Sequence, residues 1–155
     1  MEEEVMDNKE HIQAETNYIF NYNFSNNDIP EKVEEEYYDR ASALLDEYSW
    51  NDIFNCWFDY LKANCNTPEE VINWANLFYW YGGFEKPIPD PYEFLGYLYF
   101  KVDVAKYVDA AQTVFDGIAI GILEKIGKVS LIDNPNYAPE NDPEMIAAVE
   151  RWKNR

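Results

Sequence analysis

Apolar residues recur along most of this chain at three- and four-residue intervals, the spacing that places them on one face of an α-helix. The spacing predicts helices over residues 30–47, 50–63, 68–81, 91–101, 104–126 and 143–152. We therefore expect a mainly α protein in which about six helices pack as a single compact helical domain.

Helix start signals agree with these boundaries. Ser49, Thr67, Asp90 and Asp142 each supply a short polar side chain just before a predicted helix, where it caps the first backbone N–H groups. A proline follows the last three directly, which suits the first helical position. Thr67 and Glu70 also have the spacing of a reciprocal capping box.

One segment follows a different period. Residues 18–24 carry an aromatic side chain at every second position, which is the alternation of a β-strand. Because a lone strand is not stable, we expect this extended segment to lie on the domain as an arm, to pair with another short strand or to add to a partner's sheet. Residues 129–132 are the candidate for a pairing strand within the chain. Residues 1–16 are polar and acidic, so we expect a flexible N-terminus there and a single helical domain over 17–155.

The longest predicted helix, 104–126, has an apolar seam with two interpretations. Its apolar residues stand at positions 104, 108, 111, 115, 118 and 122, the alternating spacing of a coiled coil over fewer than three heptads. The seam indicates either a core helix at the centre of the bundle or the contact of a homodimer formed through residues 104–122.

Signals for catalysis are sparse. His11 is the only histidine and lies in the polar N-terminus, so we expect a solvated surface residue and not a fixed catalytic base. Cys56 and Cys65 form no C-x-x-C motif and lie too far apart on one helix for a disulfide, which predicts two buried thiols. The sequence shows no phosphate-binding loop, nucleophile elbow or EF-hand loop. We expect no enzymatic activity, no metal and no cofactor.

Composition then narrows the classes of partner. The chain has 30 acidic and 12 basic residues, a formal net charge of −18 and 47% hydrophobic residues. This charge opposes direct binding to nucleic acid or to an anionic membrane, because both require clustered Lys and Arg. The hydrophobic content is too high for a disordered acidic tail. The acidic start differs from a signal peptide, and the cysteine usage suits a reducing compartment, so we expect a cytoplasmic protein.

The acidic excess is concentrated in residues 1–48, which hold 14 acidic and 3 basic residues. At 100° per residue, four carboxylates of the 30–47 helix lie within roughly a quarter-turn, opposite its apolar side. Like charges at this spacing destabilise a helix by a few tenths of a kcal/mol per pair. The stripe therefore indicates either a solvated face that aids solubility or a surface for a basic partner. The candidate partner-binding residues are Glu31, Glu34, Glu35, Glu36, Tyr37, Tyr38, Asp39 and Asp46.

In size, acidity and its 17% aromatic content, the chain is similar to small phage and mobile-element inhibitors such as anti-restriction and anti-CRISPR proteins. No motif carries this resemblance, so it assigns no functional residues. It implies a non-enzymatic DNA mimic that binds a basic, nucleic-acid-handling protein such as a nuclease, in the host cytoplasm if a phage encodes it. The alternatives are an immunity protein or antitoxin-like partner of a basic toxin, and a self-associating helical interaction module.

Overall fold

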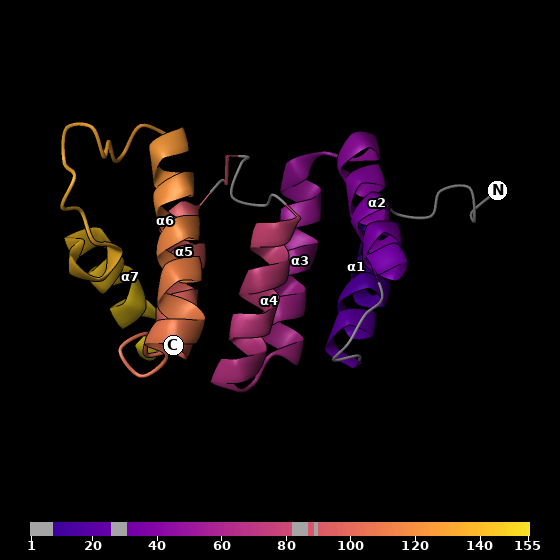
Figure 1. The fold of residues 1–155 in the computed structure, drawn as a ribbon, viewed down its shortest axis with the longest axis horizontal. Coiled ribbons are helices and arrows are strands. Elements are labelled where there is room, and N and C mark those ends of the chain that lie inside the picture. Colours follow the sequence, from indigo (N-terminus) through magenta and orange to yellow (C-terminus); the bar gives the residue numbers. More distant parts are fainter. Residues whose placement is uncertain (1–7, 26–30, 82–86, 89) are drawn as a thin grey trace. The chain divides into compact units, whose positions relative to one another are not determined.

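The computed structural model describes residues 8–25, 31–81, 87–88 and 90–155 (Figure 1). These residues form helices and turns and contain no strand, which confirms the mainly α prediction. The α-helices are α1 (Asn8–Ser25), α2 (Glu31–Glu47), α3 (Trp50–Asn64), α4 (Pro68–Trp80), α5 (Pro91–Lys101), α6 (Thr113–Lys125) and α7 (Pro143–Lys153). A π-helical turn, η3 (Val108–Gln112), precedes α6, and a 3-10 turn, η4 (Pro139–Asn141), precedes α7.

Internal contacts divide the chain into two compact units, residues 1–65 and 66–155. Helices α1 to α3 belong to the first unit and α4 to α7 to the second. The first holds 16 acidic and 4 basic residues, and the second holds 14 and 8, so both are acidic. The single domain expected over residues 17–155 stays a prediction.

The first unit has an aromatic core between α1 and α3. Phe20 of α1 lies edge-on to Trp57 of α3, with ring centroids 5.7 Å apart, and stacks on Tyr60 at 5.1 Å. Phe20 and Trp57 are fully buried. Such aromatic pairs contribute about 0.5–1.5 kcal/mol beyond the area they bury, so they fix the register of α1 on α3.

The extended segment predicted at 18–24 is wrong, because these residues form the last turns of α1. Ile12, Thr16, Ile19 and Phe20 are fully buried, at the three- and four-residue spacing of a helix. Strand geometry would place Tyr18 on the same face as Phe20, yet Tyr18 is 49% exposed and Phe20 is buried. Packing of this helical stripe outweighs the local alternation of aromatics.

Two neighbouring predictions also change. The candidate partner strand, residues 129–132, consists of irregular and turn conformation between α6 and η4. Residues 8–16, expected to be flexible, form the first half of α1, whereas residues 1–7 of the same predicted segment lie outside the described residues.

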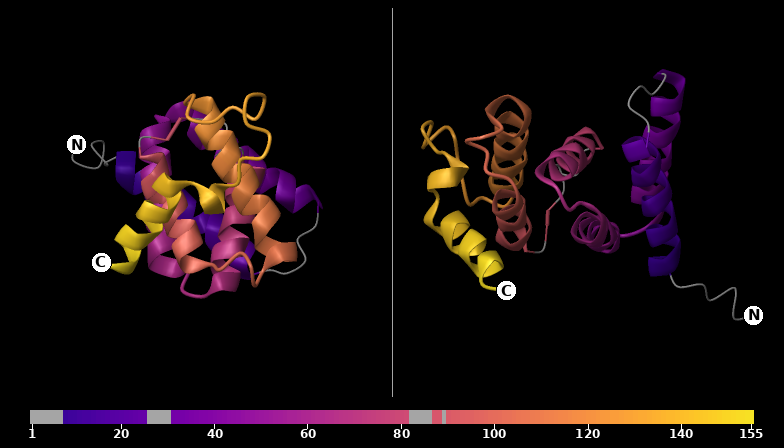
Figure 2. Two further views of the ribbon diagram at one scale, coloured as in Figure 1. Left: turned by 90° about the vertical axis from the view of Figure 1, so that its left-hand side faces the viewer. Right: turned by 90° about the horizontal axis from the view of Figure 1, so that it is seen from below.

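The second unit packs two apolar clusters around α5. On one side, Phe94 contacts Phe78 and Trp74 of α4, with ring centroids 5.1 and 5.7 Å away. On another side, α7 packs against α5 (Figure 2). Gly96 of α5 lies so close to Ala148 of α7 that a Cβ on Gly96 would stand 2.6 Å from the Ala148 Cβ. This close approach lets α7 bury its apolar side on α5.

The predicted helix starts are confirmed in most respects. Ser49 Oγ accepts the N–H of Asp52 at 3.3 Å, and Thr67 forms the full capping box with Glu70. Asp142 caps α7 by accepting the N–H of Glu144 at 2.9 Å. Asp90 stands at the N-cap of α5 but makes no side-chain capping bond.

The continuous helix predicted over 104–126 is wrong in its first part. Asp103 accepts the N–H of Ala105 at 3.1 Å, and this local turn ends the helical path after α5. The helical conformation resumes only at Val108, as the π-helical turn η3.

The seam positions of this segment favour the core-helix interpretation. Val108 is 51% exposed, whereas Ala111, Phe115, Ile118 and Ile122 are fully buried in the folded chain. The four buried side chains are out of reach of a dimer mate, and the homodimer stays an untested prediction.

Both cysteines are buried thiols, as the sequence predicts: Cys56 is 3% exposed and Cys65 is 1% exposed. In the part of the chain that the structure describes, no helix is both long enough and apolar enough to cross a membrane.

Gly127 ends α6 with a conformation that favours glycine. Its φ is +76°, its N–H donates to the carbonyl of Glu124 at 3.1 Å, and the N–H of Lys128 donates to Leu123 at 2.9 Å. These paired bonds form a Schellman motif. No atom lies within 4 Å of an added Cβ, so a substitution there changes only the backbone energy.

Gly127→Ala is therefore expected to lower the free energy of unfolding by about 1 kcal/mol, measured by urea denaturation. Gly127→Asn is the control and should cost less, because asparagine tolerates the left-handed region. Unchanged stability of the alanine variant would contradict a left-handed Gly127.

Candidate partner-binding surface

Helix α2 has one buried side and one exposed side, as its sequence predicts. Tyr37, Ala41 and Leu44 are between 2% and 4% exposed, and they face the contacts that α2 makes with α1 and α3. At 100° per residue these three lie within roughly 60° of one another. The opposite side of the helix is therefore turned to solvent.

Carboxylates occupy the solvent side of α2. Glu35, Glu36, Asp39 and Asp46 are exposed, and Glu47 extends the set at the end of the helix. None of the five forms an ion pair with another described residue. We call these five residues the acidic face of α2.

Arg40 is directed away from this face. Its guanidinium donates to Glu15 of α1 at 3.0 Å and lies over the ring of Tyr18, 4.3 Å from the centroid. The hydrogen bond to Glu15 is the main reason that the pKa of Arg40 rises above its usual value, with burial opposing it. Arg40 thus joins α2 to α1 and leaves the acidic face uncompensated at that position.

The two tyrosines predicted as anchors have different positions. Tyr37 is 4% exposed and stacks on Tyr18 at 5.6 Å, so its place on the apolar side removes it as a surface anchor. Tyr38 is 44% exposed beside the carboxylates, and its role as an anchor stays a prediction. Glu31 begins α2 and Glu34 lies in its first turns, but both side chains are outside the described residues.

His11 is held in the first unit and is not a fully solvated residue. It is half-buried in α1, its ring packs edge-on to Tyr48 with centroids 5.6 Å apart, and Nδ1 is hydrogen-bonded to the Tyr48 hydroxyl. The prediction of a solvated His11 assumed a flexible N-terminus, whereas His11 lies in helix α1. His11 joins α1 to the end of α2 and lies outside the acidic face.

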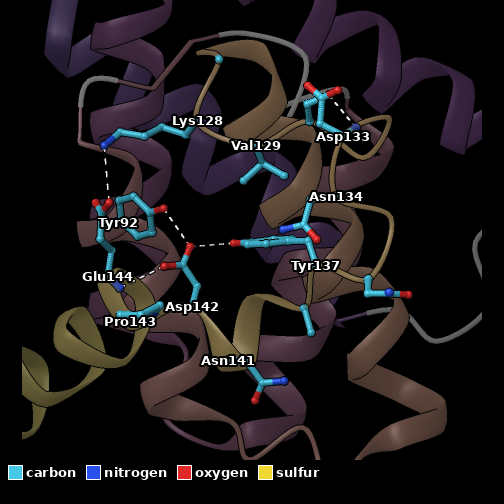
Figure 3. Close-up of a pocket in the computed structure, with 14 residues that line it drawn as sticks. Tyr92, Lys128, Val129, Asp133, Asn134, Tyr137, Asn141, Asp142, Pro143 and Glu144 are labelled. Carbon is cyan, nitrogen blue, oxygen red and sulfur yellow. Dashed lines mark hydrogen bonds and ion pairs between the residues drawn. The ribbon is translucent and has the colours of Figure 1, made fainter.

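A second candidate site is a polar hollow of about 670 Å³ in the second unit. Figure 3 shows the hydroxyls of Tyr92 and Tyr137 approaching the Asp142 carboxylate from opposite sides. They donate to the same oxygen, Oδ2, at 2.9 and 2.7 Å. Lys128 and Glu144, which also line the hollow, form an ion pair with 3.5 Å between Nζ and Oε1. Sequence spacing gave no signal for this cluster, because Tyr92 and Asp142 are 50 residues apart.

The side chains of this hollow have a structural role, and we call the hydrogen bonds of Tyr92 and Tyr137 to Asp142 the fastening at Asp142. Burial, followed by the hydrogen bond to Asp142, raises the pKa of both Tyr92 and Tyr137, so both hydroxyls stay protonated donors. Burial acts to raise the pKa of Asp142, but the donors Tyr137, Tyr92 and the Glu144 N–H lower it overall. The cluster therefore holds a stable carboxylate and two neutral hydroxyls that tie the 126–142 connection to α5.

No protein-family model matches the chain, and neither a curated protein nor a solved structure matches it. Among the described residues, no group of three or more His, Cys, Asp or Glu side chains is placed to hold a metal ion. Function must therefore be inferred from the residues and their geometry. The acidic face of α2 is the feature that fold stability explains least, because like charges on one side of a helix are destabilising.

Proposed function

We propose that this chain is a non-enzymatic, cytoplasmic inhibitor that binds a basic, nucleic-acid-handling protein through the acidic face of α2. One observation carries the proposal: five exposed carboxylates share the solvent side of a single helix whose other side is buried. A helix selected for stability alone would interleave Lys with Glu at four-residue spacing, since like charges there are destabilising. A basic groove in a partner would turn this cost into a favourable interaction.

The spacing of the carboxylates supports mimicry of a nucleic-acid backbone. At 1.5 Å per residue, Glu35 to Glu47 spans about 18 Å, so the five charges average roughly one per 4 Å of helix. One strand of DNA carries a charge about every 3.4 Å of its axis. The acidic face thus presents a line of charge similar in density to a single strand of nucleic acid.

Tyr38 supplies the apolar part of the proposed contact. Tyrosine contributes rigid area with a polar end and is enriched among residues that dominate interface energies. Because Tyr38 is 44% exposed beside the carboxylates, it would anchor the helix while they set orientation and association rate.

The test compares two variants that remove three charges each. The first, E35Q/D39N/D46N, neutralises part of the acidic face. The matched control, D109N/E124Q/D133N, neutralises three exposed carboxylates of the second unit. Binding is measured against a purified restriction endonuclease, an RNA-guided nuclease and a DNA glycosylase, over a salt series and with competing DNA. We expect wild type to bind at least one of them, more weakly at high salt and in the presence of DNA.

The α2 variant is expected to bind about 10- to 100-fold more weakly, corresponding to about 1.4–2.8 kcal/mol, and the control to stay within about 3-fold of wild type. Equal losses in both variants would show a general charge effect and contradict a role for this face. Binding that salt weakens but DNA does not displace would favour the immunity-protein alternative. Binding to none of the three enzymes would count against this class of partner.

A further inference from the structure

A group of buried polar side chains in the second unit has no part in the proposed function. Tyr99 of α5 donates its hydroxyl to Asp116 Oδ1 of α6 at 2.7 Å. Glu140, which lies in the η4 turn that contacts α6, also acts on the Asp116 carboxyl. Three elements that are distant in sequence thus meet at two carboxyl groups.

The two carboxyl groups need a proton between them. Glu140 Oε1 is buried and has no hydrogen-bond donor among the described residues. Two ionised carboxylates are both acceptors and cannot satisfy each other, whereas one proton turns either of them into a donor. No Lys or Arg of the described residues forms an ion pair with Asp116 or Glu140. A shared proton is therefore what satisfies the buried oxygen.

Several titratable groups surround Asp116 and Glu140. Helix α6 contacts α4, α5, η3 and η4. α5 contributes Tyr99, η4 contributes Glu140, and Tyr137 acts on Asp116 from the preceding connection. α4 places Tyr79 beside Gly117, the next residue of α6, and Asp109 of η3 is exposed. The η4 turn also contacts α7, whose Glu150 and Lys153 line the same groove as Glu140 and form an ion pair with each other at 3.4 Å.

The protonation equilibrium agrees with this geometry. Burial, followed by the hydrogen bond to Glu140, raises the pKa of Asp116 to about 7, against the opposing effect of the Tyr99 hydroxyl. Burial and the neighbouring Asp116 raise the pKa of Tyr99 as well, so Tyr99 remains a neutral donor.

We propose that Asp116 and Glu140 form a proton-sharing carboxyl pair that holds η4 against α6, and that loss of the shared proton to solvent loosens this turn. Two ionised carboxylates repel each other, and this repulsion would drive the Glu140 side chain outward toward solvent. Glu140 and Tyr99 border a groove of about 440 Å³ that is otherwise lined mainly by apolar side chains such as Met145 and Val149. Loosening η4 thus widens this groove, which makes the pair a pH-sensitive device.

The direction of the pH effect follows from the raised pKa of Asp116. The folded state keeps a proton that the unfolded chain releases from about pH 4 upward. The stabilising contribution is present in full below about pH 4 and is lost as the pH rises through about 7. Asp116→Asn keeps a neutral group that can accept from Tyr99 and donate to Glu140, so it should remove this loss.

The experiment measures Tm between pH 5 and pH 8 for wild type, D116N and the matched control D109N. We expect the difference in Tm between D116N and wild type to increase by about 3 °C or more from pH 5 to pH 8, and the D109N difference to stay flat. The side-chain ¹³C resonance of Asp116 should titrate near neutrality. E140Q, which also supplies a donor, should show the same trend and gives the answer if D116N fails to fold. A flat difference with Asp116 titrating near pH 4 would overturn the proposal.

Discussion

Gly96→Leu is expected to displace α7 from α5 and to lower the free energy of unfolding by about 3 kcal/mol or more. Even the first added atom has no room, because a Cβ at this position would lie 2.6 Å from the Ala148 Cβ and 3.1 Å from its backbone carbon. Helix backbones do not yield as a flexible side chain would, so the helices must separate. The larger side chain then forces them further apart.

Gly96→Ala distinguishes close packing from helix propensity, because the two effects change stability in opposite directions. In a solvent-exposed helix, replacing glycine by alanine stabilises by about 0.5–1 kcal/mol. Here we expect a loss of about 1–3 kcal/mol, because the close contact outweighs helix propensity. Stability is measured by urea denaturation, with near-UV circular dichroism reporting the packing of Trp152, which donates to the carbonyl of Glu93 at 2.8 Å.

Gly117→Ala is the matched control, since the nearest atom to a Cβ there is Tyr79 Cε2 at an ordinary 3.7 Å. This variant should be neutral or slightly stabilising. Ala148→Gly should recover part of the loss in the Gly96→Ala background, and the double-mutant cycle measures that coupling. Equal effects at Gly96 and Gly117 would contradict the close crossing of α5 and α7.

Asp142→Ala is expected to lower the free energy of unfolding by about 2–4 kcal/mol. The loss combines the N-cap of α7, which is worth about 1 kcal/mol, with the two tyrosine hydroxyls left without their acceptor. Urea denaturation at pH 7 measures the change. In a Y92F/Y137F background the same substitution should cost only about the capping contribution, because the two donors are absent.

The stability difference between wild type and Asp142→Ala is expected to change with pH in a defined direction. Because the pKa of Asp142 is lowered in the folded state, its contribution is present above about pH 4 and is lost as the pH falls through the folded value. The gap between wild type and Asp142→Ala should therefore narrow in acid. A gap that stays constant from pH 7 to pH 3 would contradict a carboxylate stabilised by these donors.

The sequence predicted what depends on neighbouring residues. Helix starts at Ser49, Thr67 and Asp142 rest on capping bonds within three residues, so local spacing identified them correctly. The two sides of α2 followed from the helical period, and the same period could have excluded Tyr37 as an anchor, since it falls beside Ala41.

The failures concern contacts between distant residues. Residues 18–24 form a helix because Ile19 and Phe20 are buried within the first unit, where Phe20 contacts α3. The local alternation of aromatic residues contains no information about that burial. The glycine at a helix crossing is Gly96, whose partner Ala148 is more than fifty residues away. The fastening at Asp142 and the carboxyl pair at Asp116 likewise join residues that no local period relates.

The burial of both native thiols has a practical consequence for studying the acidic face. Because Cys56 and Cys65 are at most 3% exposed, thiol-directed reagents reach neither of them readily in the folded chain. A cysteine introduced on the solvent side of α2 would then be the preferred site for a fluorophore, a spin label or a crosslinker. The surface proposed to meet a partner can thus be labelled at one chosen position while the native cysteines stay in place.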